Sequence, residues 1–285
     1  MEETSNMKSL EEMIEVEELR FIEPDYASLV NNGEPAVLIC EAKPAAGGAR
    51  ILLDEEGNPL LFAVNNEGVW FATSWMFRDP TPAELALFEA ADGDMYEEPR
   101  AEVEAALRAY FAQIIIEEIP PTREDITEER IDKIRSLVRE KFGESVSGIC
   151  IDACCGSGIG SQVMREIGAS PIAYDNDAEL LSLGFKNGRL KPEEAVCIDG
   201  RTASAYMPDA EFGLGIMFGQ MYQYTKDLWQ PIVEELAGIT EKTLITVATE
   251  EEAKWVQEWA AGVGRYLEIS ENDRDPIYDR WVIFG

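Results

Sequence analysis

Three acidic residues in the second half of the chain each follow a short apolar run. Asp152, Asp175 and Asp199 come directly after segments that read as buried strands, and they are almost equally spaced. In an open α/β sheet, ligands bind beyond the carboxyl ends of the parallel strands. We therefore expect the three carboxylates to gather at one site. Together they suit a ligand that carries an amine, a ribose diol and an exocyclic amine.

A glycine-rich turn begins at the first of these acids. It reads Asp152-Ala-Cys-Cys-Gly-Ser-Gly-Ile-Gly160 and leads into a helix-like segment, 161–167, closed by Gly168. Glycines permit positive φ and close approach of a ligand to the backbone. The N–H groups of the turn and of the first helical residues are free to face that ligand. The pattern predicts a binding loop, although an ordinary strand-to-helix turn with small residues is the simpler interpretation.

The elements around this loop alternate between strands and helices. Apolar runs predict strands at 149–151, 171–174, 195–198, 209–217 and 242–248, and a terminal hairpin of 266–269 with 280–284. Amphipathic or capped segments predict helices at 125–141, 227–236 and 250–261. This order is typical of an α/β domain with a mostly parallel sheet.

The first half of the chain has a different pattern. Its apolar runs predict strands at 36–40, 49–54, 60–64 and 68–72, with a hairpin signal at Asn65-Asn-Glu-Gly68. Helices are expected at 7–19, 82–88 and 99–119, and Pro120-Pro121 ends the last one. We therefore predict an N-terminal α+β domain over residues 1–121, with an accessory or substrate-binding role, and a second domain over 122–285.

From about residue 123 onward the chain resembles the class I S-adenosylmethionine (SAM) dependent methyltransferases. The resemblance implies a seven-stranded Rossmann-like sheet with an antiparallel terminal strand. It implies that the glycine-rich loop holds the methionine part of SAM, that Asp175 binds the ribose hydroxyls and that Asp199 binds the adenine amino group. The implied SAM-binding residues are Asp152, Ala153, Cys154, Cys155, Gly156, Ser157, Gly158, Gly160, Asp175, Asn176, Asp199, Gly200 and Phe218.

The loop departs from the common pattern of this family in one position. Cys154 stands where acidic-x-Gly-x-Gly-x-Gly has its first glycine, so the run is closer to the Asp-Pro-x-Cys-Gly-Ser-Gly variant of many nucleic-acid and amino-group methyltransferases. Those enzymes usually carry Asn/Asp-Pro-Pro-Tyr/Phe after the fourth strand. This chain has Phe218-Gly-Gln-Met-Tyr-Gln-Tyr224 there instead, which argues against methylation of an exocyclic amine. By position in the family, Gln220 and Tyr222 are the candidate catalytic residues, with Tyr222 able to take a proton from the acceptor.

A dinucleotide is the main competing ligand. The NAD fingerprint requires Gly-x-Gly-x-x-Gly. If the motif starts at Gly156, the position of its third glycine is occupied by Ser161. If it starts at Gly158, that position is occupied by Val163. Neither register fits, so the motif favours SAM over NAD.

Composition limits the chemistry that the chain can perform. There is no histidine, which removes the commonest general base and a common metal ligand. The five cysteines form no metal or disulfide pattern, so we expect no metal site. A reactive thiol at Cys155 is the functional alternative to a small buried side chain there. A methyltransferase tolerates these absences, because SAM carries its own activated group and the protein mainly binds and aligns the reactants.

The net charge of −32, from 56 acidic and 24 basic residues, disfavours unaided binding to nucleic acid. Such an acidic protein fits a high-salt cytoplasm or a basic partner, and the sequence does not choose between them. No apolar run reaches the roughly 18 residues needed to span a membrane, and the polar N-terminus does not read as a signal peptide. We expect a cytoplasmic protein without membrane partners.

The sequence therefore predicts a SAM-dependent methyltransferase whose acceptor is a small molecule or a protein side chain. Two alternatives remain open. One is a non-catalytic SAM- or nucleotide-binding interaction protein, and the other is an RNA or DNA methyltransferase. The sequence carries no signal for the oligomeric state.

Overall fold

A computed structural model describes residues 7–30, 34–123 and 126–285. Contacts within the chain divide it into two compact units, the first ending at Phe111 and the second running from Ala112 to Gly285. This division falls inside the long helix α4 (Arg100–Glu118), whereas we placed the domain boundary ten residues later, after the helix ends.

The first unit contains a mixed five-stranded sheet within its described residues, in the order β1-β4-β3-β2-β5. The predicted hairpin is confirmed, because β3 and β4 pair antiparallel, while the two edge strands pair parallel with their neighbours. The strands are β1 (Leu19–Phe21), β2 (Ala49–Leu53), β3 (Pro59–Asn66), β4 (Val69–Ser74) and β5 (Asp94–Glu97). The helices are α1 (Leu10–Met13), the short 3-10 helix η1 (Tyr26–Val30), α2 (Glu34–Ile39) and α3 (Pro82–Ala90).

Two predictions for this unit are wrong. The apolar run at 36–40 is not a strand; it lies largely in α2, where Ala36 and Ile39 are buried while Val37 and Leu38 are exposed. This three-residue spacing belongs to a helix, and a short apolar run alone does not reveal it. The helix expected over 7–19 is reduced to the four residues of α1, which end where Glu15 adopts a positive φ of 55°.

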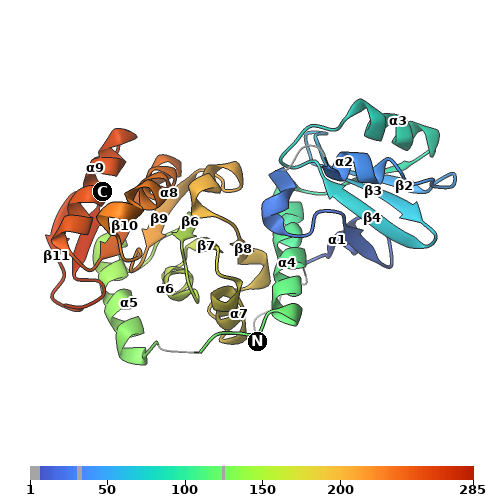
Figure 1. The fold of residues 1–285 in the computed structure, drawn as a ribbon. Coiled ribbons are helices and arrows are strands. Elements are labelled where there is room, and N and C mark those ends of the chain that lie inside the picture. Colours follow the sequence, from blue (N-terminus) through green and yellow to red (C-terminus); the bar gives the residue numbers. More distant parts are fainter. Residues whose placement is uncertain (1–6, 31–33, 124–125) are drawn as a thin grey trace. The chain divides into compact units, whose positions relative to one another are not determined.

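The second unit contains a seven-stranded sheet within its described residues, and the predicted fold class is confirmed (Figure 1). Its order is β11-β12-β10-β9-β6-β7-β8. The five strands from β6 to β10 run parallel, while β12 is antiparallel to both of its neighbours. The strands are β6 (Ile149–Ala153), β7 (Ser170–Asp175), β8 (Ala195–Cys197), β9 (Ala210–Gly215), β10 (Thr240–Val247), β11 (Glu268–Glu271) and β12 (Trp281–Phe284).

Helices cover both faces of this sheet (Figure 1). One face carries α5 (Glu128–Phe142), α6 (Ile159–Glu166) and α7 (Ala178–Lys186), and the other carries α8 (Lys226–Ile239) and α9 (Glu250–Gly262). Short 3-10 helices occur at η2 (Pro192–Glu194), η3 (Gly200–Ala205) and η4 (Gln223–Thr225). No helix among the described residues is both long and apolar enough to cross a membrane.

The strand order determines where a ligand can bind. The chain passes from β6 outward to β7 and β8, and then returns to place β9 on the other side of β6. Such a reversal opens a crevice at the carboxyl ends of the two central strands. β6 ends at Asp152 and Ala153, so the glycine-rich loop leaves the sheet at this crevice.

The first unit contains a buried ion pair between Glu84 and Arg78. Glu84 accepts hydrogen bonds from Trp75 Nε1 at 3.1 Å and from Arg78 Nη2 at 2.6 Å, and both charged side chains are at most 3% exposed. Glu84→Gln leaves the Arg78 cation buried without its counter-ion. We expect it to lower the free energy of unfolding by about 3–5 kcal/mol, measured by urea denaturation with hydrogen exchange of β3 and β4 amides.

Glu89→Gln, at an exposed position of the same helix, is the control and should stay within about 0.5 kcal/mol of the wild type. Equal stability of the two variants would contradict a structural role for the pair.

Candidate functional site

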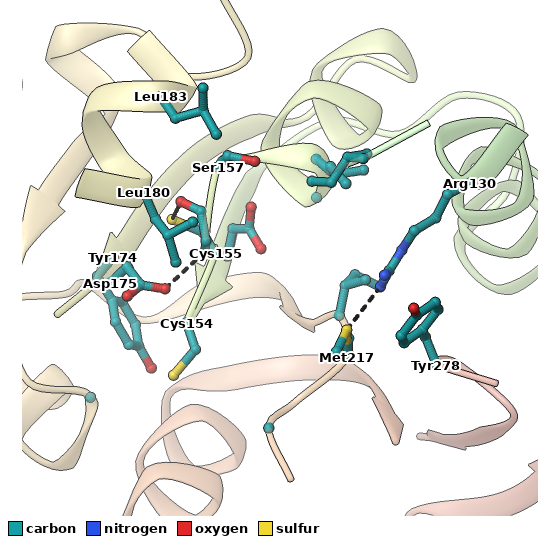
Figure 2. A pocket seen from close by; sticks show the side chains of 18 of the residues that line it. Arg130, Cys154, Cys155, Ser157, Tyr174, Asp175, Leu180, Leu183, Met217 and Tyr278 are labelled. Atoms are coloured by element: carbon teal, nitrogen blue, oxygen red, sulfur yellow. Dashed lines mark hydrogen bonds between the residues drawn. The ribbon is translucent and has the colours of Figure 1, made fainter. Parts of the chain in front are cut away.

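A cavity of about 880 Å³ opens in the second unit at the carboxyl ends of its parallel strands. Asp152, Asp175 and Asp199 all line it, together with Cys154 and Gly156 of the glycine-rich loop. The three carboxylates and the loop thus meet at one cavity, as their positions at successive strand ends require. Figure 2 shows Asp175 and the loop side chains at this cavity.

Asp152 joins the end of β6 to the start of α6. Its side chain is 1% exposed, and its Oδ2 accepts hydrogen bonds from the Ser161 amide at 2.6 Å and the Ser161 hydroxyl at 2.7 Å. Burial raises the pKa of Asp152 to about 6, and the nearby charge of Asp175 acts in the same direction. The carboxylate therefore changes its charge close to neutral pH.

The glycines of the loop have different roles. A Cβ on Gly160 would lie 2.5 Å from Asp152 Oδ1, and one on Gly158 would lie 2.5 Å from Leu190, so both positions are packed too closely for a side chain. Gly156 lines the cavity with a φ of 55°, and a Cβ there would meet no atom within 4 Å. Gly158 and Gly160 therefore allow packing of the loop, whereas Gly156 leaves the backbone open toward the cavity.

Asp175 ties the end of β7 to this loop. Its Oδ2 accepts the Gly156 amide at 2.8 Å, and its Oδ1 accepts the Asp177 amide at 2.9 Å. Burial raises its pKa above the ordinary value. A carboxylate offers about four acceptor sites, so these two bonds leave capacity for the hydroxyls of a ligand. Its neighbour Asn176 also lines the cavity.

Asp199 is held differently from the other two acids. Its carboxylate forms an ion pair with Arg201 and also accepts the Arg201 amide at 2.9 Å. These bonds lower the pKa of Asp199, which remains ionised and 38% exposed. A ligand amine at this position would share the carboxylate with Arg201. The following residue, Gly200, lines the cavity and packs against Tyr174 and Ile232.

Five of the predicted site residues do not line the cavity. Ala153 and Phe218 are completely buried, and Gly158 is the loop residue that packs closely against Leu190. Gln220 and Tyr222 hydrogen-bond to each other, with 2.9 Å between Tyr222 Oη and Gln220 Oε1, and Tyr222 is 47% exposed. The position of these two side chains outside the cavity lends no support to the predicted catalytic pair.

Three further side chains line the cavity that the sequence did not single out, namely Arg130, Met217 and Tyr278 (Figure 2). Arg130 Nη2 lies 3.2 Å from Asp279 Oδ2 and 3.3 Å from Met217 Sδ, and its guanidinium lies 4.8 Å from the centre of the Tyr278 ring. Thr246 links the group by donating to Asp279 at 2.6 Å and accepting the Met217 amide at 2.7 Å. Arg130 looks like any other charged residue of an amphipathic helix, so no sequence signal identifies it.

Arg189 supports the loop from behind. It is 7% exposed, and it donates from Nε to the Ser157 carbonyl at 2.9 Å and from Nη2 to the Ser157 hydroxyl at 3.1 Å. The conformation of the loop is therefore fixed by side chains from three segments, so its cavity side is preorganised for a ligand.

The two adjacent cysteines of the loop are poor nucleophiles. Burial raises the pKa values of Cys154 and Cys155, and the neighbouring carboxylates raise them further. Both groups are therefore thiols at neutral pH, and the thiolate is the reactive form. The surroundings disfavour the alternative of a reactive Cys155.

Comparison with known proteins gives structural similarity without sequence similarity. No protein-family model matches the chain, and no curated protein matches it significantly. The solved structures similar to it include a magnesium protoporphyrin IX methyltransferase from Synechocystis with bound SAM, at 11% identity and a TM-score of 0.43, covering 64% of this chain and 95% of that one. Another is a 1,6-didemethyltoxoflavin-N1-methyltransferase from Burkholderia thailandensis, at 14% identity and a TM-score of 0.41, covering 66% and 89%.

A third similar structure is a precorrin 8w decarboxylase from Methanobacterium thermoautotrophicum, at 14% identity and a TM-score of 0.41, covering 57% of this chain and 91% of that one. The names of these proteins cover more than one reaction. At these identities and TM-scores the reaction and the substrate of this chain have to be argued from its own site.

The packing of Gly160 predicts a specific loss of stability. Gly160→Ala places a methyl group against Asp152 and Leu214, and overpacking of this kind costs about 1–3 kcal/mol. Gly238 is an exposed glycine of α8 whose Cβ would meet nothing within 4 Å, so Gly238→Ala should instead stabilise the protein by about 0.4–1 kcal/mol.

Urea denaturation of both variants measures the difference. If Gly160→Ala is as stable as the wild type, the close approach between α6 and Asp152 is wrong.

Proposed function

We propose that this chain is a SAM-dependent methyltransferase that transfers a methyl group to an acceptor bound in the same cavity. The observation that carries the proposal is the meeting of a glycine-rich loop with Asp152, Asp175 and Asp199 at one cavity on the carboxyl edge of the sheet. The antiparallel β12 supports it further, because a terminal antiparallel pair distinguishes the methyltransferase sheet from the dinucleotide-binding one.

Each group of the ligand then has a partner of matching chemistry. Asp175 accepts hydrogen bonds from the ribose hydroxyls, and Asp199 accepts one from the adenine amino group. The open backbone at Gly156 lies against the methionine end, where the charge of Asp152 attracts the ligand's ammonium and sulfonium groups. A cationic ligand suits this cavity, because five carboxylates line it (Glu129, Asp152, Asp175, Asp199 and Asp275) against two basic residues, Arg130 and Lys133.

When bound, SAM supplies an activated methyl group, so the protein need not generate an electrophile. Its own part is to bind, align and desolvate the two reactants. The chain has no histidine, and the cavity thiols are protonated. An acceptor that is already nucleophilic as a neutral molecule therefore suits this site better than one that must first lose a proton.

The alternative of an RNA or DNA substrate is less well supported. The net charge of −32 repels a phosphate backbone, and the two basic residues that line the cavity are engaged in ion pairs. A non-catalytic SAM-binding protein would share the whole binding site, and it is distinguished by binding without turnover.

Asp175 offers the most direct test of the binding site. Asp175→Ala removes the proposed ribose acceptor, and a hydrogen bond to a charged group contributes about 1.5–3 kcal/mol, so the affinity for S-adenosylhomocysteine should fall about 10- to 150-fold. Isothermal titration calorimetry measures it. Asp209→Ala, at an exposed position before β9, is the matched control and should bind normally. Unchanged affinity in Asp175→Ala would reject the assignment.

The pKa of Asp152 predicts a dependence of binding on pH. A cationic ligand favours the ionised carboxylate, and below a pKa of about 6 the group must first release a proton. The affinity for SAM should therefore be constant above about pH 7 and decrease by up to tenfold per pH unit below about pH 6. Titrations at pH 5, 6, 7 and 8 test this, with Asp152→Asn expected to bind weakly and to lose the decrease. The same pH profile in Asp152→Asn would show that another group is responsible.

A further inference from the structure

One buried hydroxyl at the cavity has no hydrogen-bond partner. Tyr174 is 0% exposed and lines the cavity, and its Oη is unpaired among the described residues. Buried tyrosine hydroxyls usually find a partner, and leaving one unpaired costs stability. The hydroxyl is the only polar group of this side chain, so no other bond compensates for it. A protonated hydroxyl in this position has its hydrogen-bonding capacity left for a ligand atom.

Tyr174 faces a different part of the cavity from the carboxylate next to it in the chain. Successive residues of a strand point to opposite faces of the sheet, so Tyr174 and Asp175 diverge. A Cβ on Gly200 would lie 3.1 Å from both the Tyr174 ring and Ile232 of α8, which places the tyrosine on the α8 face. Figure 2 shows its hydroxyl and the Cys154 sulfur pointing to the same side, away from Ser157.

The wall on this face is apolar and closely packed. It includes Ile232 and Trp229 of α8. The Trp229 indole is fixed against Phe218, with 5.4 Å between ring centres, and against Gly219, where a Cβ would fall 1.8 Å from the indole. A large side chain at position 219 would displace the indole, so the glycine and the buried Phe218 hold it in place. An aromatic wall with one polar group is the usual construction of a small-molecule site.

The side chains on the α8 face of the cavity differ in chemistry from the carboxylates that we assign to SAM. The ribose, adenine amine and amino-acid ends of SAM already match the three carboxylates. Burial raises the pKa of Tyr174, so its hydroxyl stays protonated and donates a hydrogen bond. The basic residues that line the cavity, Arg130 and Lys133, belong to α5 on the opposite face and are paired. Among the residues that the structure describes, a negatively charged acceptor would find no free cation at this cavity.

We propose that the α8 face of the cavity, with Tyr174, Cys154, Trp229 and Ile232, binds the methyl acceptor, an uncharged aromatic small molecule that presents a hydrogen-bond-accepting atom to the Tyr174 hydroxyl. This inference rests on the proposed function and names the substrate class for it. A cavity of about 880 Å³ is near the upper end for small-molecule sites, which fits two ligands bound together. The site selects a ring with a carbonyl oxygen or ring nitrogen over the plain hydrocarbon.

A matched pair of probes tests the inference. Quinoline and naphthalene have the same shape, and only quinoline carries an accepting ring nitrogen. Both are titrated by ligand-observed NMR into wild type, Tyr174→Phe and Tyr266→Phe, each saturated with S-adenosylhomocysteine. Tyr266 is 87% exposed and does not line the cavity, so Tyr266→Phe is the control. Tyr174→Phe should weaken quinoline binding by about two- to tenfold and leave naphthalene binding unchanged.

The controls separate this role from a structural one. Tyr174→Phe should keep its affinity for S-adenosylhomocysteine and unfold at the same or a higher urea concentration, because it loses only an unpaired hydroxyl. Weaker cofactor binding or lower stability in Tyr174→Phe would overturn the inference. So would a failure of quinoline to bind the wild type, or equal affinity of quinoline for the wild type and Tyr174→Phe. If wild type does not bind S-adenosylhomocysteine at all, the proposed function fails and this inference fails with it.

Discussion

A hydrogen bond from the Gly156 amide to the Asp175 carboxylate ties the loop that follows β6 to the end of β7, beside the backbone bond from the Cys155 amide to the Tyr174 carbonyl. Parallel strands all end at the same edge of a sheet, and the loops that leave this edge must turn back without burying unpaired N–H groups. Here the carboxylates at the strand ends accept those groups, since Asp152 likewise binds the first turn of α6 through Ser161. The loop is thereby fixed while its outer surface stays open at Gly156.

This arrangement has an electrostatic cost. Burial raises the pKa values of Asp152 and Asp175, so at neutral pH the free protein holds two carboxylates in surroundings that disfavour their charge. Perturbed acids gathered in a cavity are typical of functional sites. A cationic ligand would offset this cost by stabilising the ionised carboxylates. Burial, together with the same carboxylates, also raises the pKa values of the loop cysteines and keeps them protonated.

The sequence predicted the second unit better than the first. Each central strand is a short run of apolar residues ended by an acid or a glycine, and parallel strands buried on both faces have this pattern. In the first unit the run at 36–40 had the same composition, but Pro35 lies in the first turn of a helix, and Val37 and Leu38 of the run are exposed. A run of that length fits either structure, so only the packing decides between them.

For the site, the sequence identified the side chains carried by the strand ends and missed those carried by helices and distant loops. The positions of Asp152, Asp175 and Asp199 follow from topology alone. Tyr222 and Phe218 were assigned to the site by analogy to the segment after β9. In the structure Phe218 is buried and Tyr222 lies outside the cavity, because Gly219 turns the chain between them with a φ of 65°. Tyr174 read as an ordinary strand residue, since an unpaired hydroxyl is a property of the folded protein.

The most direct measurement is a calorimetric titration of the wild-type protein with SAM, S-adenosylhomocysteine and NAD. The site described here predicts micromolar binding of the first two and none of NAD, because the loop lacks the third glycine that a dinucleotide requires. Binding of NAD, or of none of the three, would contradict the assignment of this cavity to SAM.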